Sequence, residues 1–437
     1  MMIHPIDYRY GSEGIRKIFE EDNRLQLLLD VEAAIARAHA DLGHIPAEAA
    51  DAIENNAKLS IATKEEIYEE EKRTNHDIMA MVRVLADKCG DWGRYVHFGA
   101  TSNDINDTAS AMQFRDAIDL ILDEMAELKN ALKRLAIENK GLVCVGRTHA
   151  QHAIPTTYGM KFALFLDELK RNEERMLVSY GRNCGKIAGA VGTMASYDDG
   201  FAMAEKVGDI LDINMATITN QVVPRDIYAE IMLNIALLGS LLDKMATEVR
   251  NLQRTEINEA AEGFKSTQVG SSTMPHKKNP ITSEKTCGLA RILYGNVIPS
   301  LLNNVLWHER DLTNSAPERA IIPESFILLD EMLRGMISVY GSLVLFPDNI
   351  RKNLYMSNGK NMAEAIMIAL TKKGASRQDA HEILRKISLV GDDFIGAVKS
   401  NEEIRGYLSE DEIECLLIPE NYIGEAVNLV DRVLEDD

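Results

Sequence analysis

The sequence is poor in cysteine, aromatic residues and long apolar runs. Its five cysteines are dispersed, and none lies in a CxxC pair or in a spacing typical of zinc sites. An odd number of scattered cysteines fits reduced thiols better than disulfide bonds, so we expect a cytoplasmic protein without a bound metal. The longest nearly apolar run, Ile231 to Leu242, contains Asn234 and is too short to cross a bilayer, and the N-terminus lacks the pattern of a secretory signal.

Positive charge is also scarce. Lys and Arg total 48 against 68 Asp and Glu, which gives a formal net charge of −20. An acidic surface of this kind argues against nucleic acid or an anionic membrane as a partner. It is compatible with a small anionic ligand if cations converge in one cleft.

Proline is nearly absent from long stretches rich in Ala, Leu, Glu, Lys and Met, which favours helices. Apolar residues recur every three or four positions from Phe114 to Leu135 and from Ile231 to Leu252, as in helices that pack in a bundle. Three more helical stretches are expected at Pro155–Val178, Glu284–Trp307 and Ser325–Leu343. The predicted fold class is therefore all-α, with a long central helical bundle.

Polar or proline-containing breaks divide the chain of 437 residues, which is about two to four times the length of a typical domain. Breaks at 97–107 and 346–349 predict an N-terminal helical domain (1–105), a central bundle domain (106–346) and a C-terminal helical domain (347–437). A third break, 263–280, interrupts the bundle with Gly, Ser, Thr and Pro and cannot be a regular helix. Loops held on a rigid bundle are common places for chemistry.

Two polar clusters lie in the first part of the chain. Residues 74–77 (TNHD) are either a pair on a helix surface or a histidine whose charge is tuned by Asp77. Residues 97–104 (HFGATSND) precede a predicted helix, where Thr101 and Ser102 can cap free backbone N–H groups. The same N–H groups can instead bind a ligand carboxylate, and the sequence leaves both interpretations open.

Two further clusters lie in and before the bundle. In residues 146–152 (GRTHAQH), His149 can act as a general acid, or the two histidines are solvated in a loop that leads into a helix. Residues 270–280 (GSSTMPHKKNP) combine small residues with Lys277, and a serine there can be a nucleophile or a base; the alternative is a surface loop. Lipase, Walker and Rossmann glycine patterns are absent from this segment.

The string at 271–280 resembles the signature loop of the fumarase/aspartase superfamily, whose members eliminate fumarate from substituted succinates. HFGATSNDIND and GRTHAQ resemble the first and second characteristic regions, so the resemblance covers nearly the whole chain. Within the superfamily the chain is most similar to the family of adenylosuccinate lyases. The features that carry this similarity are TNHD, the histidine before GATS, His276 in the loop, the segment from Glu309 to Arg319, and Arg9-Tyr10.

The resemblance implies a reversible elimination of fumarate from adenylosuccinate, and from the succinyl-aminoimidazole-carboxamide ribotide of purine biosynthesis. It also implies a three-domain subunit, a homotetramer with active sites shared between subunits, and no cofactor. Other superfamily members, such as the carboxymuconate cycloisomerase or argininosuccinate lyase, remain alternatives. A further alternative is a structural homologue of these enzymes that has no catalytic activity.

Residue roles follow from the resemblance by position. Ser271 is implied as general base, His149 as general acid supported by Glu284, and Lys277 as a cation at the reacting end. His76 is implied to bind the phosphate or assist the acid, and Asn75 stands where some relatives carry arginine. The implied substrate-binding residues are Arg9, Tyr10, Asn75, Asp77, His97, Thr101, Ser102, Gln221, Asn279, Arg310, Ser315 and Arg319.

Overall fold

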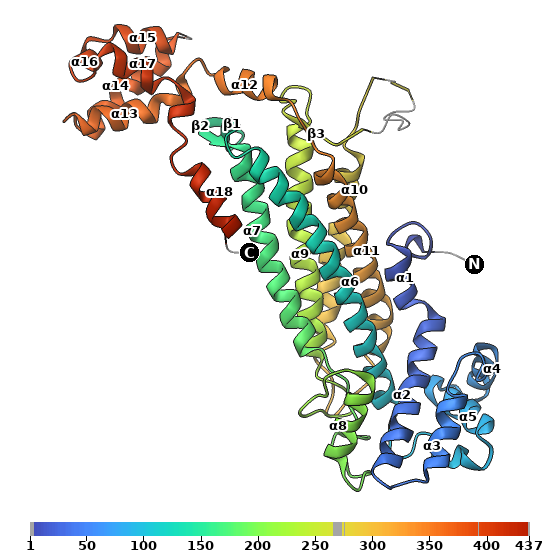
Figure 1. The fold of residues 1–437 in the computed structure, drawn as a ribbon. Helices are drawn as coiled ribbons and strands as arrows, with labels where there is room; N and C mark the ends of the chain where they lie inside the picture. The colour runs from blue at the N-terminus through green and yellow to red at the C-terminus, as the bar shows by residue number, and fades with distance from the viewer. Residues whose placement is uncertain (1–3, 265–272, 275, 392, 436–437) are drawn as a thin grey trace. The chain divides into compact units, whose positions relative to one another are not determined.

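The computed structural model describes residues 4–264, 273–274, 276–391 and 393–435, and the fold is all-α as predicted (Figure 1). The chain forms two compact units. The first unit comprises Met1–Met125, Arg171–Leu242 and Gly288–Arg334, and the second comprises Ala126–Lys170, Asp243–Cys287 and Gly335–Asp437. The five longest helices each contribute residues to both units: α6 (Ser102–Glu138), α7 (Tyr158–Arg182), α9 (Arg225–Leu252), α10 (Ile281–Leu302) and α11 (Ser315–Gly341).

Segments of these helices pack side by side within each unit (Figure 1). In the first unit, Phe114 of α6 lies against Tyr228 of α9 and Phe326 of α11, with ring centroids 4.9 and 6.0 Å apart. In the second unit, Tyr340 of α11 lies against Phe162 and Phe165 of α7, and its hydroxyl donates to a carbonyl of α9 at 3.1 Å. Interlocking aromatic rings of this kind fix the helices against one another.

Both predicted apolar stripes are confirmed as core. The side chains of each stripe expose 6% or less, because one helix face turns inward along its whole length. Three predicted boundaries are wrong. Helix α7 begins at Tyr158 because Pro155 belongs to a strand, α10 ends at Leu302 and leaves Trp307 exposed, and α11 begins at Ser315 with Pro323 inside it.

Shorter helices complete each unit. In the first unit they are α1 (Glu13–Phe19), α2 (Glu21–Asp41), α3 (Ala47–Asn56), α4 (Lys64–Thr74), α5 (Asp77–Lys88) and α8 (Gly200–Leu211), and α2, α3, α5 and α8 share one hydrophobic cluster. In the second unit they are α12 (Pro347–Tyr355), α13 (Ala363–Lys372), α14 (Arg377–Val390), α15 (Phe394–Ser400), α16 (Glu402–Arg405), α17 (Glu410–Leu416) and α18 (Ala426–Glu435). Helices α13 to α17 enclose a hydrophobic cluster of their own. The division into three domains stays a prediction.

Strands are few and all lie in the second unit among the residues described. β1 (Val143–Thr148) pairs antiparallel with β2 (Gln151–Thr157), and β3 (Ala260–Ala261) pairs with β4 (Val344–Leu345). Across the described ranges, none of the helices combines the length and apolar character needed to span a membrane.

Candidate active site

The segment that contains His149 is a β-hairpin, so the predicted loop into a helix is wrong. Thr148 pairs with Gln151, which leaves His149 and Ala150 as a two-residue turn with φ of 53° and 60°. Two successive positive φ values are typical of a type I′ turn, which usually requires Asn or Gly. The sequence carries neither, so its turn signal is missing. His149 lies exposed at the tip.

The hairpin is anchored by Glu259, a residue that sequence reasoning missed. The Glu259 side chain is fully buried and accepts hydrogen bonds from the Arg147 guanidinium, from the Tyr158 hydroxyl at 2.7 Å and from the Asn353 amide at 2.8 Å. Burial raises the pKa of Glu259, but these donors, Arg147 above all, lower it by more, so the carboxylate stays ionised. This ion pair holds the strand two residues before His149.

Part of the predicted signature loop falls outside the described residues, including Ser271. Lys277, Asn279 and Glu284 line a pocket of about 790 Å³ in the second unit, together with Arg250 and His276. Sequence reasoning missed Arg250 because it lies within the regular pattern of α9. The pocket therefore brings three predicted residues together beside an additional cation.

The two ends of this loop are joined by Gln253. The Glu262 N–H donates to Gln253 Oε1 at 3.0 Å, and Gln253 Nε2 donates to the Lys278 carbonyl at 2.9 Å. Among the described residues, no hydrogen bond or ion pair connects Glu284 to His149, and both side chains are exposed. The predicted support of His149 by Glu284 stays a prediction.

In the first unit, Thr101 and Ser102 lie at the start of α6, as expected for a helix N-terminus. The capping contact runs from the Thr101 N–H to the Asp104 carboxylate at 2.8 Å. Asp104 is completely buried. Its carboxylate also accepts hydrogen bonds from the Lys186 ammonium at 2.5 Å and from the Ala188 N–H at 2.9 Å. Both predicted residues, Thr101 and Ser102, are partly exposed.

His97 precedes this N-terminus and is held by Glu32 of α2. Its backbone N–H and its Nδ1 lie 3.0 and 2.7 Å from the two Glu32 carboxylate oxygens. Burial lowers the pKa of His97, but Glu32 raises it by more, so the net shift is upward. Glu32 carried no signal in the sequence, because it sits in the apolar repeat of a helix.

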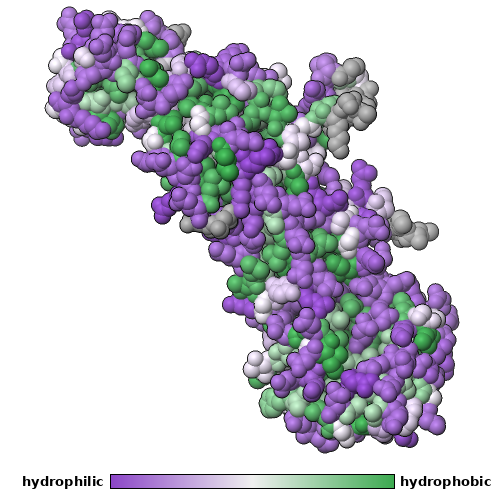
Figure 2. Space-filling model, in the orientation of Figure 1, coloured by the Kyte–Doolittle hydropathy of each residue, from purple (hydrophilic) through white to green (hydrophobic). Residues whose placement is uncertain are grey.

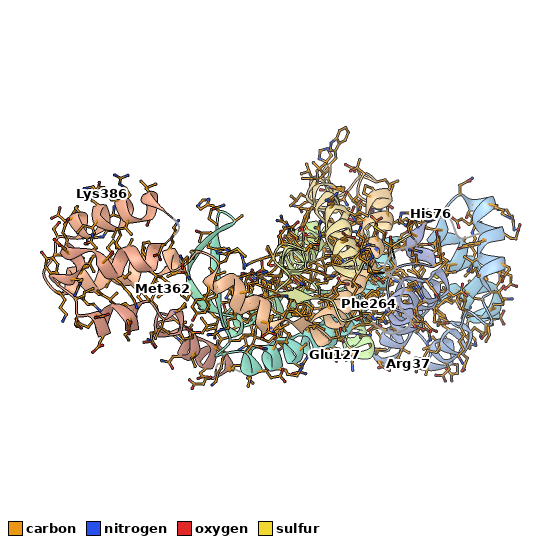
Figure 3. The ribbon with its side chains drawn as sticks, turned by 90° about the horizontal axis from the view of Figure 1, so that it is seen from above. Arg37, His76, Glu127, Phe264, Met362 and Lys386 are labelled. Atoms are coloured by element: carbon orange, nitrogen blue, oxygen red, sulfur yellow. The ribbon has the colours of Figure 1, made fainter. Side chains whose placement is uncertain are left out.

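The TNHD cluster lies at the junction of α4 and α5, not on a helix surface. Asn75 ends α4 with a left-handed φ of 53°, and His76 Nδ1 accepts the Met79 N–H at 3.4 Å as the N-cap of α5. The His76 side chain is about half exposed, at 47%. Figure 3 labels the position of His76. Asp77 forms an ion pair with Arg319 at 2.7 Å, which joins two predicted substrate-binding residues.

Arg310, Ser315 and Arg319 line a pocket of about 290 Å³ in the first unit, together with Arg24 and Asn103. Arg310 donates to the Gln221 amide oxygen at 3.1 Å, so a fourth predicted residue belongs here. Burial lowers the pKa of Arg310. Within the described part of the chain, the Arg310 Nε is buried without a hydrogen-bond partner, as suits a donor for an anionic ligand.

A buried ion-pair network supports this pocket, and sequence reasoning missed it. Arg225 contacts Asp107 at 2.9 Å and Glu318 at 2.8 Å, and Glu318 accepts from the Asn314 amide at 3.1 Å. Burial raises the pKa of Glu318 despite Arg225. Because Asn314 immediately precedes α11, the network fixes the helix end that carries Ser315.

Arg9 and Tyr10 follow a short turn at the N-terminus. Arg9 is exposed, and the Tyr10 carbonyl accepts from Arg16 at 3.0 Å. In the ranges that the structure describes, neither residue is hydrogen-bonded or ion-paired to Arg310 or Ser315. No group of three or more His, Cys, Asp or Glu side chains in those ranges is placed to hold a metal ion.

Comparisons with known proteins extend over the whole chain. A family model described as "Lyase" matches residues 8–295, and one described as "Adenylosuccinate lyase C-terminus" matches residues 359–433. The chain is 54% identical to the adenylosuccinate lyase of Pyrococcus abyssi over 99% of its own length and 98% of the relative. It is 53% identical to that of Pyrococcus horikoshii, over 100% of its own length and 98% of the relative.

A solved structure with the same fold belongs to a different enzyme. The 3-carboxy-cis,cis-muconate lactonizing enzyme of Pseudomonas putida superposes with a TM-score of 0.89 at 29% identity, over 99% of this chain and 98% of that one. Because one fold serves more than one reaction here, the fold alone does not separate them.

Proposed function

The chain belongs to the adenylosuccinate lyase family of the fumarase/aspartase superfamily, and on this premise we propose that it catalyses the reversible elimination of fumarate from adenylosuccinate to give AMP. We propose the same reaction on the succinyl-aminoimidazole-carboxamide ribotide of purine biosynthesis. The observation that carries the proposal is the 54% identity to an adenylosuccinate lyase over 99% of the chain. The free state of all five cysteines supports a cytoplasmic location.

The reaction requires one proton to leave carbon and another to reach nitrogen. We assign Ser271 as the base that removes a proton from the succinyl methylene carbon, which is bonded to the carbon that carries the nitrogen. The electron pair left by that proton becomes the carbon–carbon double bond of fumarate. The carbon–nitrogen bond then breaks, its electron pair moves to the nitrogen, and His149 donates the proton that completes the amino group of AMP. Both protons move through side chains of the chain, so the steps need no cofactor.

The intermediate carries extra negative charge on the carboxylate, which must be stabilised by donors already in place. We assign this role to Lys277 and Asn279, with Thr101 and Ser102 holding the other carboxylate. The pocket lined by Arg310, Ser315 and Arg319 supplies cations and donors for the nucleotide phosphate. His76, half exposed beside Asp77, is assigned to the same anionic end, and we place Arg9, Tyr10, Asn75 and Gln221 around the nucleotide.

We propose that the protein is a homotetramer whose active sites are shared between subunits. Within the first unit, apolar side chains on α9 and α10 are between 41 and 65% exposed: Leu233, Leu237, Ile292, Ile298, Leu301 and Leu302. Exposed apolar residues at helical spacing favour packing against further helices. Hydrophobic residues also lie exposed along the bundle helices on the face seen in Figure 2.

Ile298→Asp is expected to break this assembly, because it places a charge on the exposed apolar face of α10, where Ile298 is 60% exposed. Light scattering should give the mass of four chains for the unmodified protein and a smaller mass for the variant. Leu389→Asp, at a residue of α14 that is 71% exposed, is the matched control and should keep the larger mass. Four chains in both variants would contradict the proposed interface.

The proposed substrate is tested by incubating the purified protein separately with adenylosuccinate, argininosuccinate and 3-carboxymuconate. Fumarate should appear only from adenylosuccinate, because the Arg310 and Arg319 pocket suits a phosphorylated ligand. Fumarate from argininosuccinate, or consumption of the muconate, would move the assignment to another superfamily member. If the folded protein converts none of the three compounds, the result would favour an inactive homologue.

A further inference from the structure

The segment 97–101 is held by three polar side chains that the proposed mechanism does not use, and two of them, Glu32 and His39, are buried. Glu32 holds His97, and His39 Nε2 lies 2.9 Å from the Phe98 carbonyl. Ser196 donates to the Gly99 carbonyl at 2.5 Å. Backbone polar groups of successive residues are thus fixed by side chains of the protein itself, and the segment does not depend on ligand for its shape.

The contact between Glu32 and His97 is bidentate. The Glu32 side chain is 0% exposed, and its two oxygens face the His97 N–H at 3.0 Å and Nδ1 at 2.7 Å. A carboxylate only accepts, so Nδ1 carries a proton and the imidazole is fixed in one orientation. His97 itself adopts a φ of 63°, a conformation that a non-glycine residue keeps only when its surroundings hold it.

In this arrangement the Nδ1 of the His97 imidazole contacts Glu32, and the Nε2 does not. The His97 side chain is 13% exposed, and in the described part of the chain its Nε2 has no hydrogen-bond partner. We propose that Glu32 is a positioning residue that fixes the orientation and positive charge of His97, so that Nε2–H is presented to an anionic oxygen of the substrate. The inference rests on the proposed function and adds Glu32 to its site.

Among the other charged groups near His97, Asp104 acts in the same direction as Glu32. Asp104 of α6 adds a second anion, and Lys186 neutralises it in part through their ion pair. Two further titratable groups pack around this segment, since His39 lies against Phe98 and Tyr197. Burial raises the pKa of Tyr197 and lowers that of His39, so both are neutral near pH 7. Glu32 is therefore the group in direct contact that keeps a proton on His97.

Glu32→Gln tests this directly, since glutamine keeps the shape and removes the charge. The KM for adenylosuccinate at neutral pH should rise about tenfold, with kcat changed by less than about twofold, because a binding contact is weakened and the chemistry is untouched. The pH above which KM rises should move downward, because His97 loses its proton more easily. Glu54→Gln, which removes an exposed partner of Arg37, is the control and should leave both constants unchanged.

A double-mutant cycle separates positioning from a general structural role. His97→Asn should raise KM as Glu32→Gln does, and adding Glu32→Gln to His97→Asn should change KM no further. Additive effects, or a KM and pH profile unchanged by Glu32→Gln, would overturn the proposal. An unmodified protein that releases no fumarate would instead overturn the proposed function, so the two failures are distinguishable.

Discussion

Replacing His149 with glutamine is expected to lower kcat by about 10²- to 10⁴-fold, the usual cost of losing a general acid. The leaving nitrogen would have to depart without a proton from the enzyme. Glutamine can occupy the same exposed turn position, so the hairpin and substrate binding should persist, and KM should stay within about threefold. Steady-state release of fumarate from adenylosuccinate measures both constants.

The matched control is His152→Gln. His152 lies in the same hairpin, on β2 opposite Arg147, and burial together with Arg147 lowers its pKa. It has no assigned proton to transfer, so its replacement should leave kcat within about threefold. Full turnover by His149→Gln, or an equal loss in His152→Gln, would remove His149 from the role of acid.

Lys186→Met is expected to cost about 3–5 kcal/mol of unfolding free energy, because it leaves a buried carboxylate without its cation. Both side chains of the Lys186–Asp104 pair are 0% exposed. Asp104 also holds the Thr101 N–H, so the loss should reach the predicted carboxylate-binding residues and raise KM in whatever fraction stays folded. Thermal melting at matched protein concentration measures the stability change.

The comparison variant is Lys399→Met, which removes a surface ion pair with Glu414 whose side chains are 37% and 55% exposed. Its expected cost is about 0–1 kcal/mol, because solvent screens the pair. Equal melting temperatures for Lys186→Met and Lys399→Met would show that the buried pair contributes little to stability.

The long helices could be predicted from the sequence because a helix that is buried on one face carries apolar residues every three or four positions, as from Phe114 to Leu135. The candidate site segments could be proposed from the sequence because their residue types are chemically specific and lie close together in sequence. GRTHAQ and the loop ending in Pro280 are examples. Such local patterns survive in a sequence whatever the fold around them.

The supports of the site could not be predicted, because each joins residues far apart in the chain. Arg147 and Glu259 are 112 positions apart, and Glu32 and His97 are 65 apart. Nothing in the sequence around Glu32, which lies within a helical repeat, indicates that it pairs with His97. The hairpin was missed for a related reason: the Arg147–Glu259 pair steadies a turn whose own residues, His149 and Ala150, do not favour it.

Cleavage of adenylosuccinate by elimination is tested by quantifying AMP and fumarate together in one reaction of the purified, unmodified protein. Elimination predicts equal amounts of the two products, and formation of adenylosuccinate when AMP and fumarate are supplied instead. A folded protein that yields neither product, or that yields one without the other, would contradict the account.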